Sequence, residues 1–433
     1  MKTSQKNAIT ISNVNLFNGY SMLPNRTVIF KDGVITEITT DFVIEGDIID
    51  GTGKTLMPGL FDAHTHTSVD SLRNALKFGV TTELEMMGGF TKKGRAQQLK
   101  NTYDIADVRS AGMALTAPGG HPDELIPKGD GIPDFVLAEM EKMTPEEREA
   151  FLEAHRKEEE ATENGLDVTS IEGAKRFVQR QFENGADYFK IMIEDGKVMN
   201  CPGLPMISEE VMRVVVKEAH RMHKLVIAHV LTAEAAMTAV RIGVDGLAHL
   251  FIDRPIWTDK LVQAIAEQQM FVTPCLVLNS SIIGENACEF AHDHRVSPKL
   301  DLKWKDTMCS CFKTFPQGNM EDNYKNVLDL HQAGVPILVG TDVSVPVPHL
   351  GGLAHGASVH HEMQFLVKAG LSNLEAMKAA TSVPAHIFNL LDRGTIELGK
   401  RADLVLVDGD PSLNISDSLS IINVWKEGIS YIH

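Results

Sequence analysis

Cysteine, positive charge and long apolar runs are all scarce in this sequence. The chain has 5 Cys among 433 residues and no CxxC pair, so we expect reduced thiols in a reducing compartment. Lys and Arg total 41 against 58 Asp and Glu, and the formal charge of -17 argues against nucleic acid or an anionic membrane as the partner. No apolar run approaches the ~18 residues that span a bilayer, and the first residues lack the apolar core of a signal peptide. These absences predict a cytoplasmic protein that does not enter membranes.

Both ends of the chain carry a β-type pattern. Short alternating runs with Gly and Asp turns, such as TVIFKDGVITEI near the start and GKRADLVLVDGD near the end, predict strands. Neither end has enough apolar surface to form a core alone. We therefore predict that residues 1–57 and 392–433 combine into a small composite β-sandwich, with a larger domain of residues 58–391 inserted between them.

The inserted segment alternates compact apolar runs with longer stretches of helical spacing. Eight such runs are present: GLFDAHTH, VTTELEMM, GMALTAPGG, DYFKIMI, KLVIAHV, DGLAHL, FVTPCLV and PILVGTD. Eight strands with helical returns favour an α/β fold of the (β/α)8 TIM-barrel type. One connection, near residues 122–165, is dense in charge and is expected to form a solvated helical insertion.

Six polar side chains interrupt these apolar runs, and most of the six lie near the end of a run. They are His64, His66, Lys190, His229, His249 and Asp342. Side chains two apart on a strand share a face, and a TIM barrel places its active site where the strands end, so we expect all six to converge there. Imidazole and carboxylate ligands suit Zn²⁺ or a similar divalent ion. A buried neutral lysine could also react with CO₂, giving a carbamate able to bridge two metal ions.

These residues and their surroundings resemble the amidohydrolase superfamily. The resemblance rests on PGLFDAHTH, the strand lysine, the two later histidines, GTD and the terminal β-type segments, and it covers essentially the whole chain. GVTTELEM, FKIM, GTDVSVPVPHLGG and LVKAGLSNLEAMKAAT are similar to the imidazolonepropionase-like and Xaa-Pro dipeptidase-like (prolidase-type) branch. Members of this branch are binuclear zinc peptidases or amidases with a carboxylated lysine, and neighbouring members hold one metal.

The resemblance implies a role for each matched residue. His64, His66 and Asp342 would hold one Zn²⁺, His229 and His249 a second, and carboxylated Lys190 would bridge the two. A hydroxide shared by the metals would attack an amide, peptide or cyclic C–N substrate, with Asp342 shuttling the proton. His121 and His349 are loop candidates for substrate contact. We also expect a small-molecule substrate and a homo-oligomer.

Two departures from the branch leave the substrate open. Relatives often carry His-Ala-aromatic-Gly after the fifth strand, whereas this chain has His229-Val230-Leu231-Thr232, which lacks a residue for a substrate carboxylate. Glu194-Asp195-Gly196 replaces a small Gly-rich turn after the lysine strand and adds negative charge near the barrel mouth. Both changes bring a dipeptide substrate into question.

Three other functions stay open at this point. The first is a mononuclear deaminase or imidazolonepropionase-like hydrolase, in which Lys190 remains an amine. The second is a Schiff-base lyase using Lys190 as the nucleophile. The third is a non-catalytic structural barrel, which would be expected to lack some of the ligands.

Overall fold

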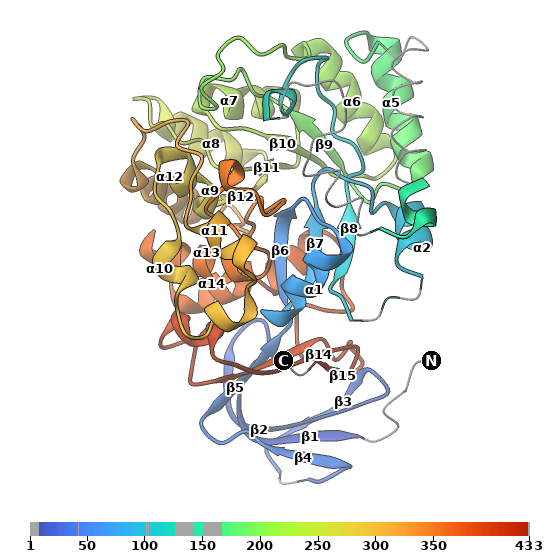
Figure 1. Ribbon diagram of the computed structural model, residues 1–433, viewed down its shortest axis with the longest axis vertical. Helices are drawn as coiled ribbons and strands as arrows, with labels where there is room; N and C mark the ends of the chain where they lie inside the picture. The colour runs from blue at the N-terminus through green and yellow to red at the C-terminus, as the bar shows by residue number, and fades with distance from the viewer. Residues whose placement is uncertain are drawn as a thin grey trace.

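The structure is a computed structural model that describes residues 8–41, 43–100, 102, 104–125, 143–149 and 167–431. Figure 1 shows a sheet of terminal strands below a larger α/β assembly that carries most of the helices. Among the described residues, no helix combines the length and apolarity needed to cross a bilayer.

The terminal sheet is built from both ends of the chain. Its strand order is β15-β14-β13-β5-β1-β2-β3, with β4 pairing β1. Its strands are β1 (Ile9–Phe17), β2 (Met22–Lys31), β3 (Val34–Thr39), β4 (Asp47–Asp50), β5 (Lys54–Pro58), β13 (Leu404–Asp408), β14 (Ile421–Lys426) and β15 (Ile429–Tyr431). One buried cluster joins side chains from the two ends, including Leu16, Leu406 and Trp425. Each end therefore supplies part of the apolar surface that the other lacks.

The larger assembly contains two parallel sheets, ordered β6-β7-β8 and β12-β11-β10-β9. Their strands are β6 (Leu60–Thr65), β7 (Val80–Glu85), β8 (Asp107–Ser110), β9 (Phe189–Met192), β10 (Val226–His229), β11 (Gly246–Ala248) and β12 (Phe271–Thr273). Isolated parallel bridges extend the edges: Leu115 pairs with Ile191, Ile337 with Val272, and Val343 with Thr65. The result is a TIM-barrel-like α/β fold.

Helices follow most of these strands. They are α1 (Val69–Lys77), α2 (Lys92–Gln98), α5 (Ile171–Asn184), α6 (Glu209–Arg221), α7 (Ala233–Ile242), α8 (Thr258–Glu267), α9 (Leu276–Ile283), α10 (Cys288–Ala291), α11 (Leu302–Met308), α12 (Met320–Gln332), α13 (Ala357–Lys368), α14 (Asn373–Ala379) and α15 (Ser382–Ile387). Short 3₁₀ turns are η1 (Asp123–Leu125), η2 (Ser297–Lys299), η3 (Pro348–Leu350) and η4 (Ile415–Leu419). Helix α5 shows the local signals clearly, because the Ser170 side chain caps its first turn and left-handed Gly185 ends it.

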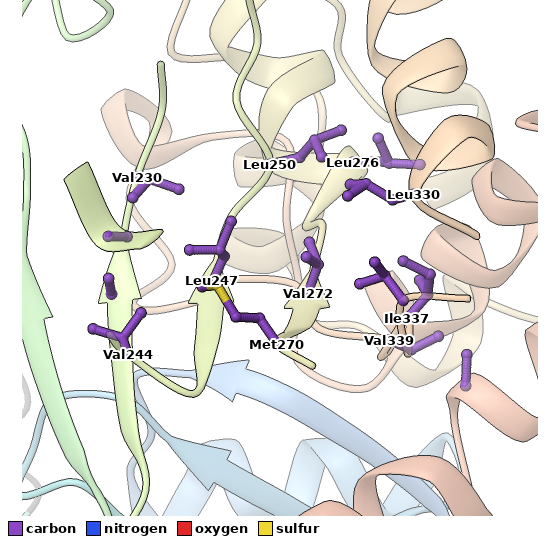
Figure 2. Packing of buried hydrophobic residues seen from close by; sticks show 14 of the residues in the cluster. Val230, Val244, Leu247, Leu250, Met270, Val272, Leu276, Leu330, Ile337 and Val339 are labelled. Atoms are coloured by element: carbon purple, nitrogen blue, oxygen red, sulfur yellow. The ribbon is translucent and has the colours of Figure 1, made fainter. Parts of the chain in front are cut away.

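A buried apolar layer lies between the strands and these helices. Figure 2 shows Leu247 of β11 and Val272 of β12 in this layer, together with Val244 and Met270, which precede these strands, and Leu330 of α12. Burial of such side chains contributes roughly 1.5–3 kcal/mol each. This layer fixes the strands that carry the polar residues.

Two of the predicted strands differ from the structure. The third run, residues 112–120, is not the strand: β8 lies just before it, and Gly112 adopts φ 65, which breaks the extended backbone. The eighth run, residues 336–342, forms bridges and single hydrogen bonds instead of a full ladder. Most of the predicted charged insertion near 122–165 lies outside the described residues.

The prediction of five reduced thiols is wrong for two of them. Cys288 and Cys309 form a disulfide, while Cys201, Cys275 and Cys311 are free. The Ala287 N–H donates to the Met308 carbonyl at 2.8 Å and so brings the start of α10 against the end of α11. A spacing of 21 residues between the two cysteines gave no sign of this contact.

The start of α9 is capped from another helix. Its N-cap, Cys275, makes no side-chain cap, and both oxygens of buried Glu362 on α13 instead accept the N–H groups of Leu276 and Val277, at 2.9 and 2.8 Å. We expect Glu362→Ala to lower the free energy of unfolding by about 2–4 kcal/mol, because two buried donors lose their acceptors. Urea denaturation measures this change, and Glu267→Ala at the exposed end of α8 is the control. Equal stability of the two variants would contradict the assigned role.

Candidate functional site

Strand alternation puts Lys190 and His229 on the same face of the β9–β10 pair. Lys190 lies beside Ile227 in the parallel register, and His229 follows Ile227 by two positions. The residues on either side of Lys190 in the sequence, Phe189 and Ile191, belong to the apolar layer between the strands and the helices. Lys190 is 1% exposed and His229 3%, so both functional groups are enclosed.

The first group of converging side chains is His64, His66 and Asp342. The Nε2 atoms of His64 and His66 lie 2.9 and 3.0 Å from the same atom, Oδ1 of Asp342. The Nδ1 atom of His66 lies 3.0 Å from the Met87 carbonyl oxygen. Because a carbonyl only accepts, Nδ1 carries a proton. In the tautomer with its proton on Nδ1 alone, Nε2 directs a lone pair at the carboxylate. A cation between these acceptors would remove their repulsion, so the donor set fits a metal ion.

The second group is Lys190, His229 and His249, which adjoins the first through His64. Lys190 Nζ lies 3.3 Å from His64 Nε2. The ring of His249 is centred 4.6 Å from that of His64 and 4.7 Å from that of His229. The Nδ1 atom of His249 is buried without a hydrogen-bond partner among the described residues. An unsatisfied buried nitrogen next to other imidazoles also suits a ligand site.

Burial sets the charge states of the imidazoles. It lowers the pKa of His64 to about 3 and holds the pKa values of His229 and His249 well below the usual range. Burial likewise lowers the pKa of Lys190 to about 8. The imidazoles of His64, His229 and His249 are therefore in the neutral form that binds metals, and the lysine amine is easier to deprotonate than a surface lysine.

Strained backbone occurs at three residues of this region. His249 adopts φ 73, Asp342 φ 60 and Cys275 φ 51, all in the left-handed region that side chains with a Cβ rarely occupy. Cys275 Sγ lies 3.6 Å from His64 Nδ1, so all three are site residues or contact one. Strain of this kind persists only where the surrounding structure holds it, and it is concentrated at functional sites.

A buried carboxylate beneath the site positions His64. Asp62 Oδ1 accepts the N–H groups of His64 and Thr341 at 3.2 and 3.0 Å, and Oδ2 accepts the Thr341 hydroxyl at 2.6 Å. Burial raises the pKa of Asp62 to about 8. Gly340 allows this approach, because a Cβ there would lie 2.9 Å from the His64 nitrogen. His64 on the first strand and the segment that carries Asp342 are thus held together by short contacts.

The site is open to solvent on the His66 side. The His66 and Asp342 side chains are 27% and 20% exposed. A cavity of about 300 Å³ next to them is lined by His66, Trp304 and Ser344 among others. This volume is at the lower end of the range for small-molecule sites.

The two predicted substrate contacts lie in different surroundings. His121 is 8% exposed, and its ring is centred 4.4 Å from that of His229, so it adjoins the converging residues. Its Nδ1 lies 2.6 Å from Glu124 Oε1. His349 lies in the exposed turn η3, and among the described residues no hydrogen bond or ion pair links it to the site.

Two further residues, which contact His229 and His64, had no role assigned from sequence. Glu194 Oε2 lies 3.3 Å from His229 Nε2, and Cys275 contacts His64. The acidic turn at Glu194 was visible in the sequence as a departure from the branch, and its contact with His229 was not. Cys275 gave no signal beyond lying at the end of an apolar run.

A TIM-barrel-like fold with imidazoles and a carboxylate at its strand ends defines a class of hydrolases. Residues 172–430 match the Amidohydrolase family, and the chain belongs to that family. The protein is therefore a hydrolase acting on carbon–nitrogen bonds, a family that is typically metal-dependent.

Individual relatives are distant. The chain is 24% identical over 448 residues to an ochratoxinase of Aspergillus niger, covering 94% of this chain and 82% of the relative. It is 23% identical over 368 residues to a 5-methylthioadenosine/S-adenosylhomocysteine deaminase of Pelotomaculum thermopropionicum, covering 84% and 74%. A solved Xaa-Pro dipeptidase with bound methionine matches with a TM-score of 0.71 at 20% identity, over 98% of this chain and all of the other.

Proposed function

We propose that the protein is a metal-dependent amidohydrolase that cleaves an amide, peptide or cyclic C–N bond in a small molecule. The observation that carries the proposal is the approach of two imidazole Nε2 atoms, from His64 and His66, to one oxygen of Asp342. The ochratoxinase and dipeptidase relatives support an amide or peptide as the substrate class.

The residues would divide between two metal ions. His64, His66 and Asp342 would hold one ion and His229 with His249 the other, with Zn²⁺ favoured by the imidazole-rich set. Lys190, as a carbamate formed from CO₂, would bridge them. When bound, such ions would polarise the substrate carbonyl and make the attacking water more acidic.

Asp342 would move the proton. Its carboxylate would take a proton from the attacking water as oxygen bonds to the carbonyl carbon. The same carboxylate would then donate this proton to the leaving nitrogen as the C–N bond breaks. A carboxylate beside a bound cation stays ionised, so Asp342 would be ready to accept a proton.

A second candidate is a mononuclear deaminase or imidazolonepropionase-like hydrolase. Its support is the deaminase relative, together with the compact set of His64, His66 and Asp342, whose ligand atoms lie within 4.8 Å of one another. In this reading Lys190 stays an amine. The metal content per chain separates the two candidates.

We also propose that residues 1–57 with 392–433 form a composite β-sandwich domain, and that residues 58–391 form a closed (β/α)8 barrel. The terminal sheet shared by β1–β5 and β13–β15 supports the first boundary. The bridges at Leu115, Ile337 and Val343 support closure of the barrel.

Metal removal tests the proposed function. We expect the purified protein to contain about two Zn²⁺ per chain, and a chelator to abolish hydrolysis of a panel of N-acyl amino acids, dipeptides and cyclic amides. Elemental analysis, product detection and re-addition of Zn²⁺ measure the effect. A lower melting temperature after chelation is expected, because a ligand that binds only the folded state stabilises it.

The outcomes separate the candidates. About one metal per chain, with deamination of aminopurines in place of amide cleavage, would favour the deaminase. Full activity of a metal-free protein would reject both candidates.

A further inference from the structure

Two buried carboxylates lie beside the proposed metal ligands without a formal role. Glu124 and Glu194 have side chains 8% and 2% exposed. Glu124 contacts His121, and Glu194 contacts His229, whose rings are 4.4 Å apart. Each carboxylate therefore lies against one ring of an adjacent pair of imidazoles. We call Glu124 and Glu194 the acidic pair.

The acidic pair has unused acceptor capacity. Glu124 Oε2 is buried and has no hydrogen-bond partner in the described part of the chain. Glu194 Oε1 accepts the Gly196 N–H at 2.7 Å, but among the described residues its Oε2 has only the long 3.3 Å contact to His229. A buried carboxylate oxygen without a donor costs about 1–3 kcal/mol or more. A donor from outside the chain would recover this energy.

The charge of the pair is also unbalanced. Within the described residues, no Lys or Arg nitrogen lies within 4.0 Å of either carboxylate, whereas the neighbouring Asp195 has Lys197 at 2.7 Å. Among the described residues, the side-chain partners of the pair are the imidazoles of His121 and His229, and His229 belongs to the proposed ligand set. In this part of the chain the acidic pair therefore has no Lys or Arg partner.

An organic cation fits this arrangement better than a metal ion. Ligand atoms that could share one ion lie within 4.8 Å of one another in three places among the described residues, and none of these groups includes Glu124 or Glu194. Within the described part of the chain, the acidic pair therefore belongs to no three-ligand group that would hold a single ion. An alkylammonium or a guanidinium carries several N–H donors and can span separated carboxylates.

We propose that the acidic pair is a substrate subsite that binds a positively charged amine group, an alkylammonium or a guanidinium, next to the bond that is cleaved. This inference rests on the proposed function and narrows its substrate class to cationic amides. Contact between His229 and Glu194 places the subsite beside the reacting centre. The chain's charge of -17 would also favour the approach of such substrates.

Matched substrates test the subsite. The substrates Arg-Ala and Ala-Arg are compared with the two dipeptides in which citrulline replaces arginine. Citrulline has nearly the shape of arginine but carries no charge. We expect kcat/KM to favour arginine by about tenfold to a hundredfold, the range for one charge-assisted bond. Glu124→Gln and Glu194→Gln should each reduce this ratio by about tenfold. Glu210→Gln, on the exposed first turn of α6, should keep the wild-type ratio.

A binding measurement separates failure of the subsite from failure of the proposed function. Isothermal titration of the metal-loaded protein with L-arginine and with L-citrulline should show tighter binding of arginine, lost in Glu124→Gln. If no amide of any charge is cleaved but arginine is still preferred, the proposed function fails and the subsite stands. Equal kcat/KM for arginine and citrulline substrates, or a ratio unchanged in both glutamine variants, would overturn the subsite.

Discussion

Replacing Asp342 by asparagine is expected to lower kcat/KM by about 10³-fold or more, near the upper part of the range for loss of a general base. The substitution keeps the shape but removes the charge that faces His64 and His66. An amide cannot take the proton from water, and it is a weaker ligand than a carboxylate. Asparagine tolerates the left-handed backbone of residue 342, so the fold should be kept. Steady-state kinetics on the best substrate of the panel measures the loss.

Two controls make this result specific. Asp408→Asn, on an exposed residue at the end of β13, should leave kcat/KM and the melting temperature unchanged. Thermal unfolding and metal analysis of Asp342→Asn distinguish loss of proton transfer from loss of the ion. Near-wild-type kcat/KM in a folded Asp342→Asn protein would show that Asp342 is not the proton carrier.

Replacing Lys190 by alanine is expected to reduce bound metal from about two ions per chain to about one and to lower kcat/KM by at least about 10²-fold. Lys190 is buried among imidazoles, where a protonated amine is costly, and its pKa is lowered to about 8. A group held only for stability would not be placed there. Because the variant removes this burial cost, we expect it to lose little thermal stability when it is compared with the wild type in the metal-free state.

Adding a short carboxylate to the Lys190→Ala variant tests whether the lysine acts as a carbamate. Acetate can occupy the space left by the lysine stem and supply two anionic oxygens, so it should restore part of the metal content and activity of Lys190→Ala. Lys325→Ala, on the exposed face of α12, is the matched control. Full activity with both metals retained would rule out a bridging carbamate. Trapping of substrate on Lys190 by borohydride would instead favour a Schiff-base lyase.

The positions of His64, His66 and Asp342 could be predicted from local sequence patterns. Period-two alternation predicted that His64 and His66 share a face, and the position of Asp342 at the end of an apolar run predicted its approach to them. The structure brings these three within 3.0 Å contacts. Their roles as metal ligands stay proposals. These contacts could be anticipated because each depends on a strand and its end, which the sequence encodes locally.

Other features depend on contacts between distant segments, which local patterns do not contain. The Cys288–Cys309 disulfide forms because two short helices meet. In the cap of α9, Glu362 accepts hydrogen bonds from Leu276 and Val277, which precede it by 86 and 85 positions. The third strand was misplaced because apolar residues after Gly112 looked as strand-like as those of β8. Glu194 was noticed as added charge, but its partner His229 lies on another strand.

The composite terminal sheet has a consequence for how the chain is made. Strand β5 pairs with β1 on one side and with β13 on the other, and the Thr55 hydroxyl donates to the carbonyl of Gly409, 354 positions later. While the ribosome is still producing the barrel, β5 presents an unpaired edge that invites mispairing. Such distant pairing also slows folding, since long loops must close before the contacts form. The sheet can therefore be completed only after β13, β14 and β15 have left the ribosome.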